Sequence, residues 1–284
     1  MKKPKIVITG ASGFIGRHVI QLLSENNQIE IIPLSRRVLP NFKTVSTYED
    51  APDGDILIHL ADDSNVGSAA YNSSQFLNSS LLTTKSLSMK SYEKIIYASS
   101  ALVYSDKFKT PRTVNDETSI ENRYARLKKE SEDIILSNPK GIVVRISNVY
   151  GMGMSSKSLI GEVLDKLKSE AVIEIRDSAP VRDFIHVNDV AEGISMIALS
   201  CISNLKNKPV YNLGTGIGTS IGELSLIMTD LAGQARRRIK FRNFNSTESC
   251  IILDSSLTEE IFGWKFRTPL ELGLSKFFLK GEME

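Results

Sequence analysis

The sequence is poor in cysteine and histidine, two residue types that commonly bind zinc. Its 284 residues include two cysteines and three histidines. Cys201 and Cys250 have no partners at the spacing of a metal site, and a pair of small buried thiols fits them better than a disulfide. We therefore expect a protein of the reducing cytoplasm that binds no metal.

Long hydrophobic runs and a strong charge imbalance are also absent from the sequence. No apolar run approaches the ~20 residues of a membrane-spanning helix, and the formal net charge is +2. An apolar strand pattern begins at once, which leaves no room for a signal peptide. The near-neutral charge gives no general attraction to nucleic acid or to a membrane surface, so we expect neither as a partner.

The N-terminal residues combine a short strand, a glycine-rich turn and the start of a helix. The β-branched run 6–8 is typical of a buried strand, and glycines then recur at every third position before the helical pattern 14–23. Free backbone N–H groups and the positive helix end make such a turn an anion site, which a pyrophosphate can approach because Cβ atoms are missing. The turn predicts dinucleotide binding, and the alternative is an ordinary turn with glycines for packing only. The residues expected to bind the cofactor are Gly10, Ser12, Gly13, Phe14, Ile15 and Gly16.

Strand-like and helix-like segments alternate along the first half of the chain. Short apolar runs predict strands at 29–34, 44–48, 56–60, 94–98 and 142–146, and helical patterns span 69–90 and 124–136. This alternation predicts an α/β fold with a Rossmann-type doubly wound parallel sheet.

The pattern changes to shorter segments after residue 150. Helical patterns span 159–167, 187–199, 221–231 and 270–279, and strand patterns span 172–175 and 210–213. We expect residues 1–150 and 187–213 to form a dinucleotide-binding domain. Residues 151–186 and 214–284 are expected to form a small α+β C-terminal lobe for the substrate.

The residues after the second predicted strand bear on the choice of cofactor. Ser35, Arg36 and Arg37 stand where an NAD site normally carries an acid for the ribose 2′-hydroxyl and an NADP site carries an arginine for the 2′-phosphate. There is no acid and there are two arginines, so the sequence favours NADP (NADPH) over NAD. The alternative is a solvated basic loop.

Small or polar residues follow five of the predicted strands. Ligands of open α/β sheets bind outside the carboxyl ends of the strands. The convergence of these strand ends at one edge of the sheet predicts the ligand site. The segments concerned are 10–16, 35–37, Ala61 with Asp62, Ser99 with Ser100, and Asn148.

Tyr124 and Lys128 are four residues apart on a predicted helix and so share one face. An ammonium beside a phenol favours the phenolate, which allows a tyrosine to act as a general acid or base for a hydroxyl–ketone interconversion. A surface pair is the alternative. The presence of Ser100 and the glycine turn in the same chain favours the catalytic interpretation.

Six motifs in this order resemble the extended short-chain dehydrogenase/reductases, a family of nucleotide-sugar epimerases, dehydratases and 4-ketoreductases. The resemblance covers nearly the whole chain, up to Gly263-Trp264. The motifs are Thr9-Gly10-x-x-Gly13-x-x-Gly16, His59-Leu60-Ala61, Ser99-Ser100-x-x-Val103-Tyr104, Tyr124-x-x-x-Lys128, Asn148-Val149-Tyr150-Gly151 and Arg182-Asp183-Phe184-Ile185-His186-Val187.

The resemblance implies roles for individual residues. Ser100 would hold the sugar oxygen, Tyr124 would give or take its proton, and Lys128 would bind the nicotinamide ribose and tune the tyrosine. Asn148 would face the substrate. Leu60 and Ala61 join the cofactor-binding residues, and a homodimer through the helices at 69–90 and 124–136 would follow the family's habit.

Arg182 resembles the family arginine that contacts the nucleotide diphosphate, a role that suits a guanidinium. The alternative is a salt bridge with Asp183. His186 is expected to be a structural hydrogen-bonding residue and His59 a core residue, neither of them a catalytic base. The basic run 236–242 could add a diphosphate contact or be solvated surface.

Departures from the family pattern bear on the reaction. Ala101 and Leu102 replace the acidic pair of the dehydratases, and they cannot move protons. Dehydration is therefore disfavoured. Because Arg36 and Arg37 favour NADPH, which suits a net reductant exchanged at every turnover, we expect an NADPH-dependent reductase of a nucleotide-linked 4-keto-6-deoxyhexose. The alternative is a UDP-hexose 4-epimerase with retained NAD. A non-catalytic NADP-sensing regulator is disfavoured by the intact Ser100, Tyr124 and Lys128.

Overall fold

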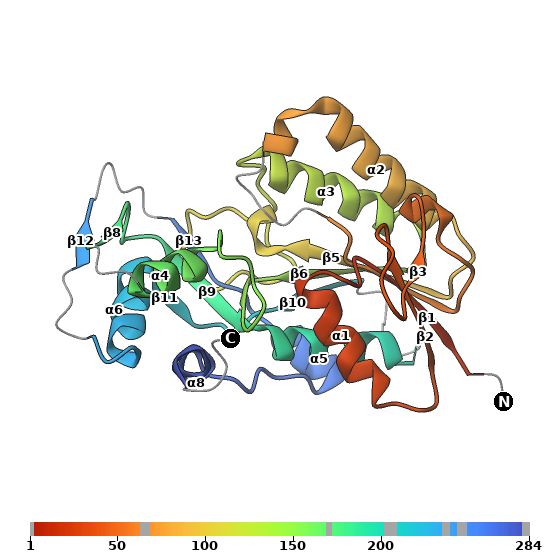
Figure 1. Ribbon diagram of the computed structural model, residues 1–284. Helices are drawn as coiled ribbons and strands as arrows, with labels where there is room; N and C mark the ends of the chain where they lie inside the picture. Colours follow the sequence, from red (N-terminus) through yellow and green to blue (C-terminus); the bar gives the residue numbers. More distant parts are fainter. Residues whose placement is uncertain are drawn as a thin grey trace.

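A seven-stranded parallel sheet forms the centre of the protein in this computed structural model, which describes residues 3–62, 69–168, 172–201, 209–234, 239–242 and 249–279 (Figure 1). Its strand order is β10-β6-β5-β4-β1-β2-β3, and every neighbouring pair is parallel. The order reverses between β1 and β4, which is where ligands bind in such sheets. The predicted doubly wound sheet is confirmed. Its strands are β1 (Lys5–Thr9), β2 (Glu30–Ser35), β3 (Lys43–Thr44), β4 (Ile56–His59), β5 (Lys94–Ser100), β6 (Gly141–Ile146) and β10 (Val210–Leu213).

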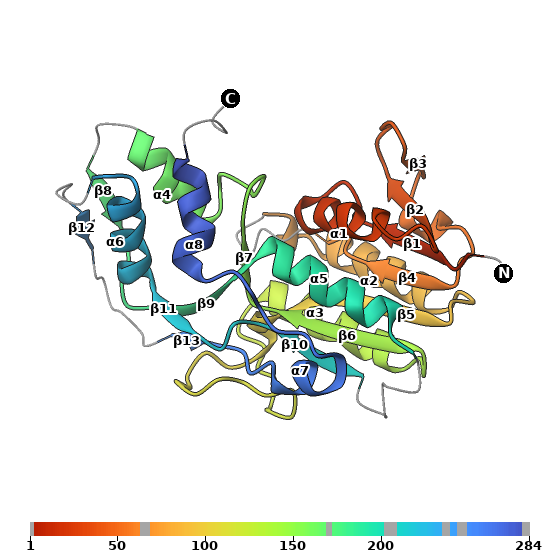
Figure 2. The same ribbon diagram turned by 90° about the horizontal axis from the view of Figure 1, so that it is seen from below.

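Helices cover both faces of this sheet. Figures 1 and 2 show α1 (Phe14–Ser24) and α5 (Val187–Leu199) on one face, and α2 (Ser74–Ser88) and α3 (Arg123–Leu136) on the other. The two faces have separate hydrophobic cores: Ile6 and Ile8 pack with Val19 and Ile194, whereas Val7 packs with Leu87. Successive strand residues point to opposite faces, which explains why the apolar run in β1 is continuous.

Two predicted elements in the first half of the chain are each divided into shorter pieces. The strand expected at 44–48 is the two-residue β3 and a separate 3₁₀ turn at Tyr48–Asp50, whose capping box is closed by the side chains of Thr47 and Asp50. The helix expected at 69–90 is a 3₁₀ turn at Ala69–Asn72 followed by α2. Ser73 starts α2 because its side chain accepts a hydrogen bond from the N–H of Phe76.

A smaller α+β lobe lies beside the carboxyl ends of the large sheet (Figure 1). β9 (Val181–His186) is its central strand and pairs with β7 (Asn148–Tyr150), β11 (Gly218–Ser220) and β13 (Cys250–Ile251). β8 (Ile173–Ile175) and β12 (Ile239–Phe241) form a separate parallel pair. The helices of the lobe, which share a hydrophobic core with Phe184, are α4 (Leu159–Lys168), α6 (Ile221–Leu231) and α8 (Leu270–Ser275).

Residues 256–264, which we assigned to the lobe, pack instead on the large sheet. α7 (Ser256–Phe262) lies beside β10, and the ring of Phe262 packs edge-on against Tyr211. The indole N–H of Trp264 donates to the carbonyl of Asp189 at 2.9 Å. The rest of the expected domain division stays a prediction. No helix within the described part of the chain is long and apolar enough to cross a membrane.

Candidate active site

The glycine turn between β1 and α1 is shaped to receive an anion. Gly10 has a φ of +66°, and a Cβ at this position would lie 2.6 Å from the carbonyl carbon of Leu60. A Cβ on Gly16 would collide with the carbonyl oxygen of Gly10. Gly13 starts α1 without a side-chain cap, so the first N–H groups of the helix stay available to a ligand. The turn therefore fits the diphosphate of a dinucleotide.

A cavity of about 470 Å³ opens at this turn and continues into the lobe. It lies at the carboxyl ends of β1, β4, β5 and β6, where the sequence predicted a ligand site. Both parts of the molecule contribute to its wall, so one ligand could contact the glycine turn and the lobe together. The predicted site residues in its lining are Gly10, Gly13, Phe14, Ile15, Gly16, Leu60, Ser100, Tyr124, Lys128 and Asn148.

Helix α3 brings Tyr124 and Lys128 to the cavity on one face. Asn122 starts the helix by accepting a hydrogen bond from the N–H of Ala125 at 2.9 Å. Tyr124 and Lys128 are both buried, and the Lys128 ammonium lies 5.9 Å from the centre of the Tyr124 ring. The ring of Tyr71 packs edge-on against the ring of Tyr124. The tyrosine is thereby held beside the ammonium at the cavity wall.

Ser100 ends β5 and begins a 3₁₀ turn, where its hydroxyl accepts a hydrogen bond from the N–H of Leu102 at 3.2 Å. Its hydroxyl proton stays available to donate to a ligand oxygen. Asn148 is exposed at the start of β7 on the lobe side of the same cavity. Ser100 and Asn148 thus contribute polar groups from two different sheets.

Asp62, which the sequence placed at one of the five strand ends without giving it a role, has specific partners in the site. Its Oδ2 accepts hydrogen bonds from the Lys128 ammonium at 2.7 Å and from the Tyr97 hydroxyl at 2.8 Å. Burial opposes charge on Lys128, but Asp62 and the neighbouring tyrosines raise the pKa of Lys128 well above its ordinary value. Burial likewise opposes charge on Asp62, but Lys128 and His59 hold the pKa of this carboxyl below its ordinary value. Both groups are therefore charged at neutral pH.

A second buried ion pair lies one turn further along α3. Glu132 accepts hydrogen bonds from the Arg145 guanidinium at 2.9 and 2.7 Å and from the Ser99 hydroxyl at 2.5 Å. It follows Lys128 by four residues, so Tyr124, Lys128 and Glu132 form one buried row. The spacing of four residues was the available sequence signal for Glu132. The hydrogen bonds of Glu132 connect α3 with Ser99 of β5 and Arg145 of β6.

The residues predicted to select the cofactor lie outside the lining of this cavity. The Ser35 hydroxyl accepts a hydrogen bond from the N–H of Arg37 at 3.0 Å, and the Arg36 guanidinium lies over the ring of Tyr48. Both arginines are exposed at the end of β2, which is the neighbour of β1 and ends at the same edge of the sheet. Two further predicted cofactor residues, Ser12 and Ala61, flank lining residues without belonging to the lining themselves.

Arg182 also lies outside the cavity lining. Its guanidinium donates to the carbonyl of Val181 at 2.8 Å and to the Ser249 hydroxyl at 2.8 Å. The alternative of a salt bridge with Asp183 is wrong, because successive side chains of β9 point to opposite faces. The buried carboxylate of Asp183 instead accepts hydrogen bonds from the N–H groups of Thr215, Gly216 and Leu253.

The two histidines that lie in the family-like motifs have structural partners, as expected. His59 is buried, and its Nδ1 lies 2.7 Å from the Thr9 hydroxyl. His186 begins α5, where its Nδ1 accepts from the N–H of Asn188. Burial lowers the pKa of each imidazole to about 4. Both rings are therefore neutral at physiological pH.

Part of the basic run at 236–242 can be placed. Lys240 and Arg242 pair with Glu174, with N–O distances of 3.8 and 2.8 Å. Arg236, Arg237 and Arg238 lie outside the described residues. Over the described ranges no cluster of three potential metal ligands occurs.

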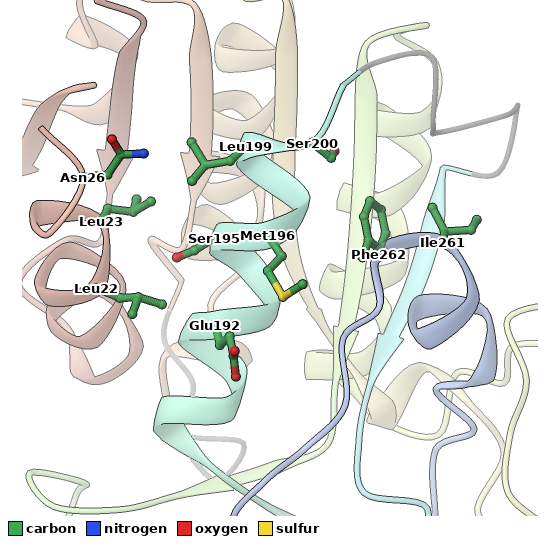
Figure 3. Close-up of a pocket in the computed structure, with 10 residues that line it drawn as sticks. All are labelled: Leu22, Leu23, Asn26, Glu192, Ser195, Met196, Leu199, Ser200, Ile261 and Phe262. Carbon is green, nitrogen blue, oxygen red and sulfur yellow. The ribbon is translucent and has the colours of Figure 1, made fainter. Parts of the chain in front are cut away.

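A second cavity, of about 450 Å³, lies between α1, α5 and α7. Figure 3 shows that its wall is mainly apolar, with Leu22 and Leu23 of α1 on one side of α5 and Phe262 of α7 on the other. It adjoins the carboxyl end of α1, whereas the glycine turn is at the amino end of that helix. Among the described residues its lining contains one ionisable side chain, Glu192, and no lysine or arginine, so it offers no cation for phosphate binding.

Comparison with known proteins agrees with this geometry. UDP-glucose 4-epimerase of Neisseria meningitidis serogroup C is 27% identical over 94% of each chain, and that of Pisum sativum is 25% identical over 94% of this chain and 92% of the relative. The crystal structure of UDP-glucose 4-epimerase with UDP-glucose from Thermotoga maritima shares the fold, with a TM-score of 0.83, 21% identity and coverage of 95% and 96%. A sequence model of the NAD dependent epimerase/dehydratase family matches residues 6–214. The chain belongs to the NAD dependent epimerase/dehydratase family.

Proposed function

We propose that this protein is a nucleotide-sugar 4-epimerase that acts on a UDP-hexose and holds a nicotinamide cofactor at the glycine turn. The observation that carries the proposal is the composition of the 470 Å³ cavity. Ser100, Tyr124 and Lys128 line it together with the glycine turn, while Ala101 and Leu102 supply no acid for a dehydration. The UDP-glucose 4-epimerases among the relatives support the same reaction.

The cofactor part of the proposal rests on the turn and on Lys128. The first N–H groups of α1 would bind the diphosphate, since a helix amino end favours an anion. The ammonium of Lys128 would hold a ribose hydroxyl beside Tyr124. When bound, the nicotinamide supplies a reversible acceptor for a hydride.

Proton transfer falls to Tyr124 and Ser100. Tyr124 takes the proton of the sugar 4-hydroxyl while the Ser100 hydroxyl donates a hydrogen bond to the same oxygen. The 4-keto sugar then presents its other face, and Tyr124 returns the proton. The same residues serve both directions, which is why an epimerase needs no further acid or base.

The lobe would bind the rest of the substrate. Asn148 and Phe184 line the same cavity from the lobe side, which suits a sugar and its nucleotide. For Arg182 we propose a diphosphate contact that requires its side chain to leave Ser249. We also propose a homodimer through the outer faces of α2 and α3, where Leu82 is exposed.

A second candidate is NADPH-dependent reduction of a nucleotide-linked 4-keto sugar. It is favoured by Arg36 and Arg37, which are exposed at the end of β2 and carry no ion pair within the described ranges. A 2′-phosphate would satisfy both guanidinium groups. This reaction would use Ser100, Tyr124 and Lys128 in the same way.

Two parallel incubations separate the epimerase from the reductase. The purified protein is mixed with UDP-glucose without added cofactor, and the nucleotide sugars are separated by anion-exchange chromatography. A parallel sample receives NADPH and a 4-keto nucleotide sugar, and absorbance follows NADPH. We expect UDP-galactose in the first sample. NADPH consumption in the second sample without UDP-galactose in the first would replace the epimerase with the reductase.

A further inference from the structure

Asp62 lies at the end of β4, between the glycine turn and the Tyr124–Lys128 pair. Its side chain is 9% exposed and that of Lys128 is 6% exposed, and both residues line the cavity. Oδ2 takes both hydrogen bonds, from Lys128 and from Tyr97. The other carboxylate oxygen, Oδ1, has no partner among the residues that the structure describes. A carboxylate oxygen that no described residue occupies, at a cavity wall, can accept from a ligand.

The Lys128 ammonium has one N–H donor that no described residue accepts. It carries three N–H donors, and two of them go to Asp62 at 2.7 Å and to the carbonyl of Ala98 at 2.8 Å. Among the described residues one donor therefore remains for the cavity. Within that part of the chain, an acceptor and a donor without other partners lie side by side, which is the pattern that a vicinal diol satisfies with its two hydroxyl groups.

The charges around this pair keep both groups ionised. The titratable groups that face it within the described residues are His59 from β4, Tyr97 from β5 and Tyr124 from α3. None of them brings a second positive charge at neutral pH, since His59 is neutral there. Among these groups, only Asp62 carries a negative charge that compensates the Lys128 ammonium at neutral pH.

We propose that Asp62 is a positioning residue of the cofactor site: Oδ2 fixes the Lys128 ammonium, and Oδ1 accepts a hydrogen bond from a hydroxyl of the nicotinamide ribose. The proposal rests on the cofactor part of the proposed function and does not depend on which sugar is the substrate. A purely structural ion pair between β4 and α3 is the competing interpretation.

The test compares the binding of two ligands by titration calorimetry, after any nucleotide that the purified protein retains has been removed. NADH contains the nicotinamide ribose, whereas ADP contains only the part that binds the glycine turn. In the Asp62→Asn variant we expect NADH affinity to fall at least about tenfold, the usual range for a hydrogen bond to a charged group, and ADP affinity to change less than about twofold. Equal losses for both ligands would mean a structural role and would overturn the proposal.

The matched control is Asp133→Asn. Asp133 lies on α3 and pairs with Lys129, but this pair is exposed on the outer face of the helix. The control should leave both affinities unchanged. Loss of NADH binding in the control to the same degree as in Asp62→Asn would also count against Asp62.

A crystal structure of the unaltered protein with NADH keeps the test decisive if Asp62→Asn does not fold. We expect Asp62 Oδ1 within about 3 Å of a ribose hydroxyl oxygen, the ordinary hydrogen-bond distance. A separation beyond about 4 Å overturns the proposal. Failure of the unaltered protein to bind NADH overturns the cofactor part of the proposed function as well, which separates the two failures.

Discussion

At the scale of single residues, the proposed mechanism gives Tyr124 the most specific task. The Tyr124→Phe variant keeps the ring that packs against Tyr71 but loses the hydroxyl that would exchange the proton. We expect turnover to fall by about two to four powers of ten, the range for general acid–base groups, with cofactor affinity unchanged. Steady-state kinetics and calorimetry check this. Turnover equal to that of the unaltered protein would remove Tyr124 from the mechanism.

The second prediction at this scale concerns Arg36 and Arg37 and the choice between NADPH and NADH. Replacing both by alanine removes the two exposed cations at the end of β2. If they bind a 2′-phosphate, NADPH affinity should fall at least about tenfold, with little change for NADH. Fluorescence titration with both cofactors measures the difference. Equal losses for NADPH and NADH would mean that the arginines do not read the 2′-phosphate.

The site residues differ in how far sequence alone could identify them. Tyr124 and Lys128 are found by their spacing of four, because one helix turn brings them together. The pair of Lys128 with Asp62 joins positions 66 residues apart, and no local pattern reports such a contact. Arg182 was expected at the diphosphate, but its contacts with Ser249 depend on the pairing of β9 with β13, which its own strand does not reveal.

At the scale of elements, α3 depends on the buried pair of Glu132 and Arg145. Glu132→Gln removes the charge that compensates Arg145, which is 5% exposed. We expect the free energy of unfolding to fall by about 3–5 kcal/mol, the usual cost of leaving a buried charge unpaired. Urea denaturation measures it.

Glu130→Gln is the matched control for that variant. Glu130 pairs with Arg126 one turn away on the exposed side of the same helix, at 2.8 Å. Exposed pairs of this kind contribute about 0.5 kcal/mol or less. A loss in Glu132→Gln no larger than in the control would mean that Arg145 is compensated in another way.

The elements of the large sheet were easier to predict than those of the lobe. α5 and β10 have the expected bounds, because α5 is long with a clear helical period and β10 is a short segment that ends directly before Gly214. β11 and β13 have three and two residues, too few for a period of two to be recognised. Each of them is a strand because it pairs with one edge of β9. That pairing depends on the folded arrangement and cannot be predicted from the residues of the short segment.

At the scale of the whole molecule, two buried histidines make stability depend on pH. The pKa of His59 and that of His186 are each lowered from 6.5 to about 4 in the folded protein. The unfolded chain therefore binds more protons between these values, and stability falls as the pH decreases from about 6.5 to about 4. At about pH 5 the fully buried His59 should cost about 2 kcal/mol relative to neutral pH, and the less deeply buried His186 should cost less.

This prediction is checked by urea denaturation at neutral pH and at about pH 5. The His59→Asn variant removes one of the two groups, so its stability should fall less on acidification than that of the unaltered protein. The comparison of the two slopes separates the histidine from the carboxylates, which both proteins share. Identical slopes would mean that His59 is not a buried neutral group.

The central claim is that the protein inverts the sugar at C4 by removing a hydride and returning it. The most direct measurement uses UDP-glucose that carries deuterium at C4, incubated with the protein in ordinary water. Mass spectrometry and NMR of the products should find UDP-galactose with the deuterium still at C4. UDP-galactose with hydrogen from the solvent at C4, or no UDP-galactose at all, would contradict the account.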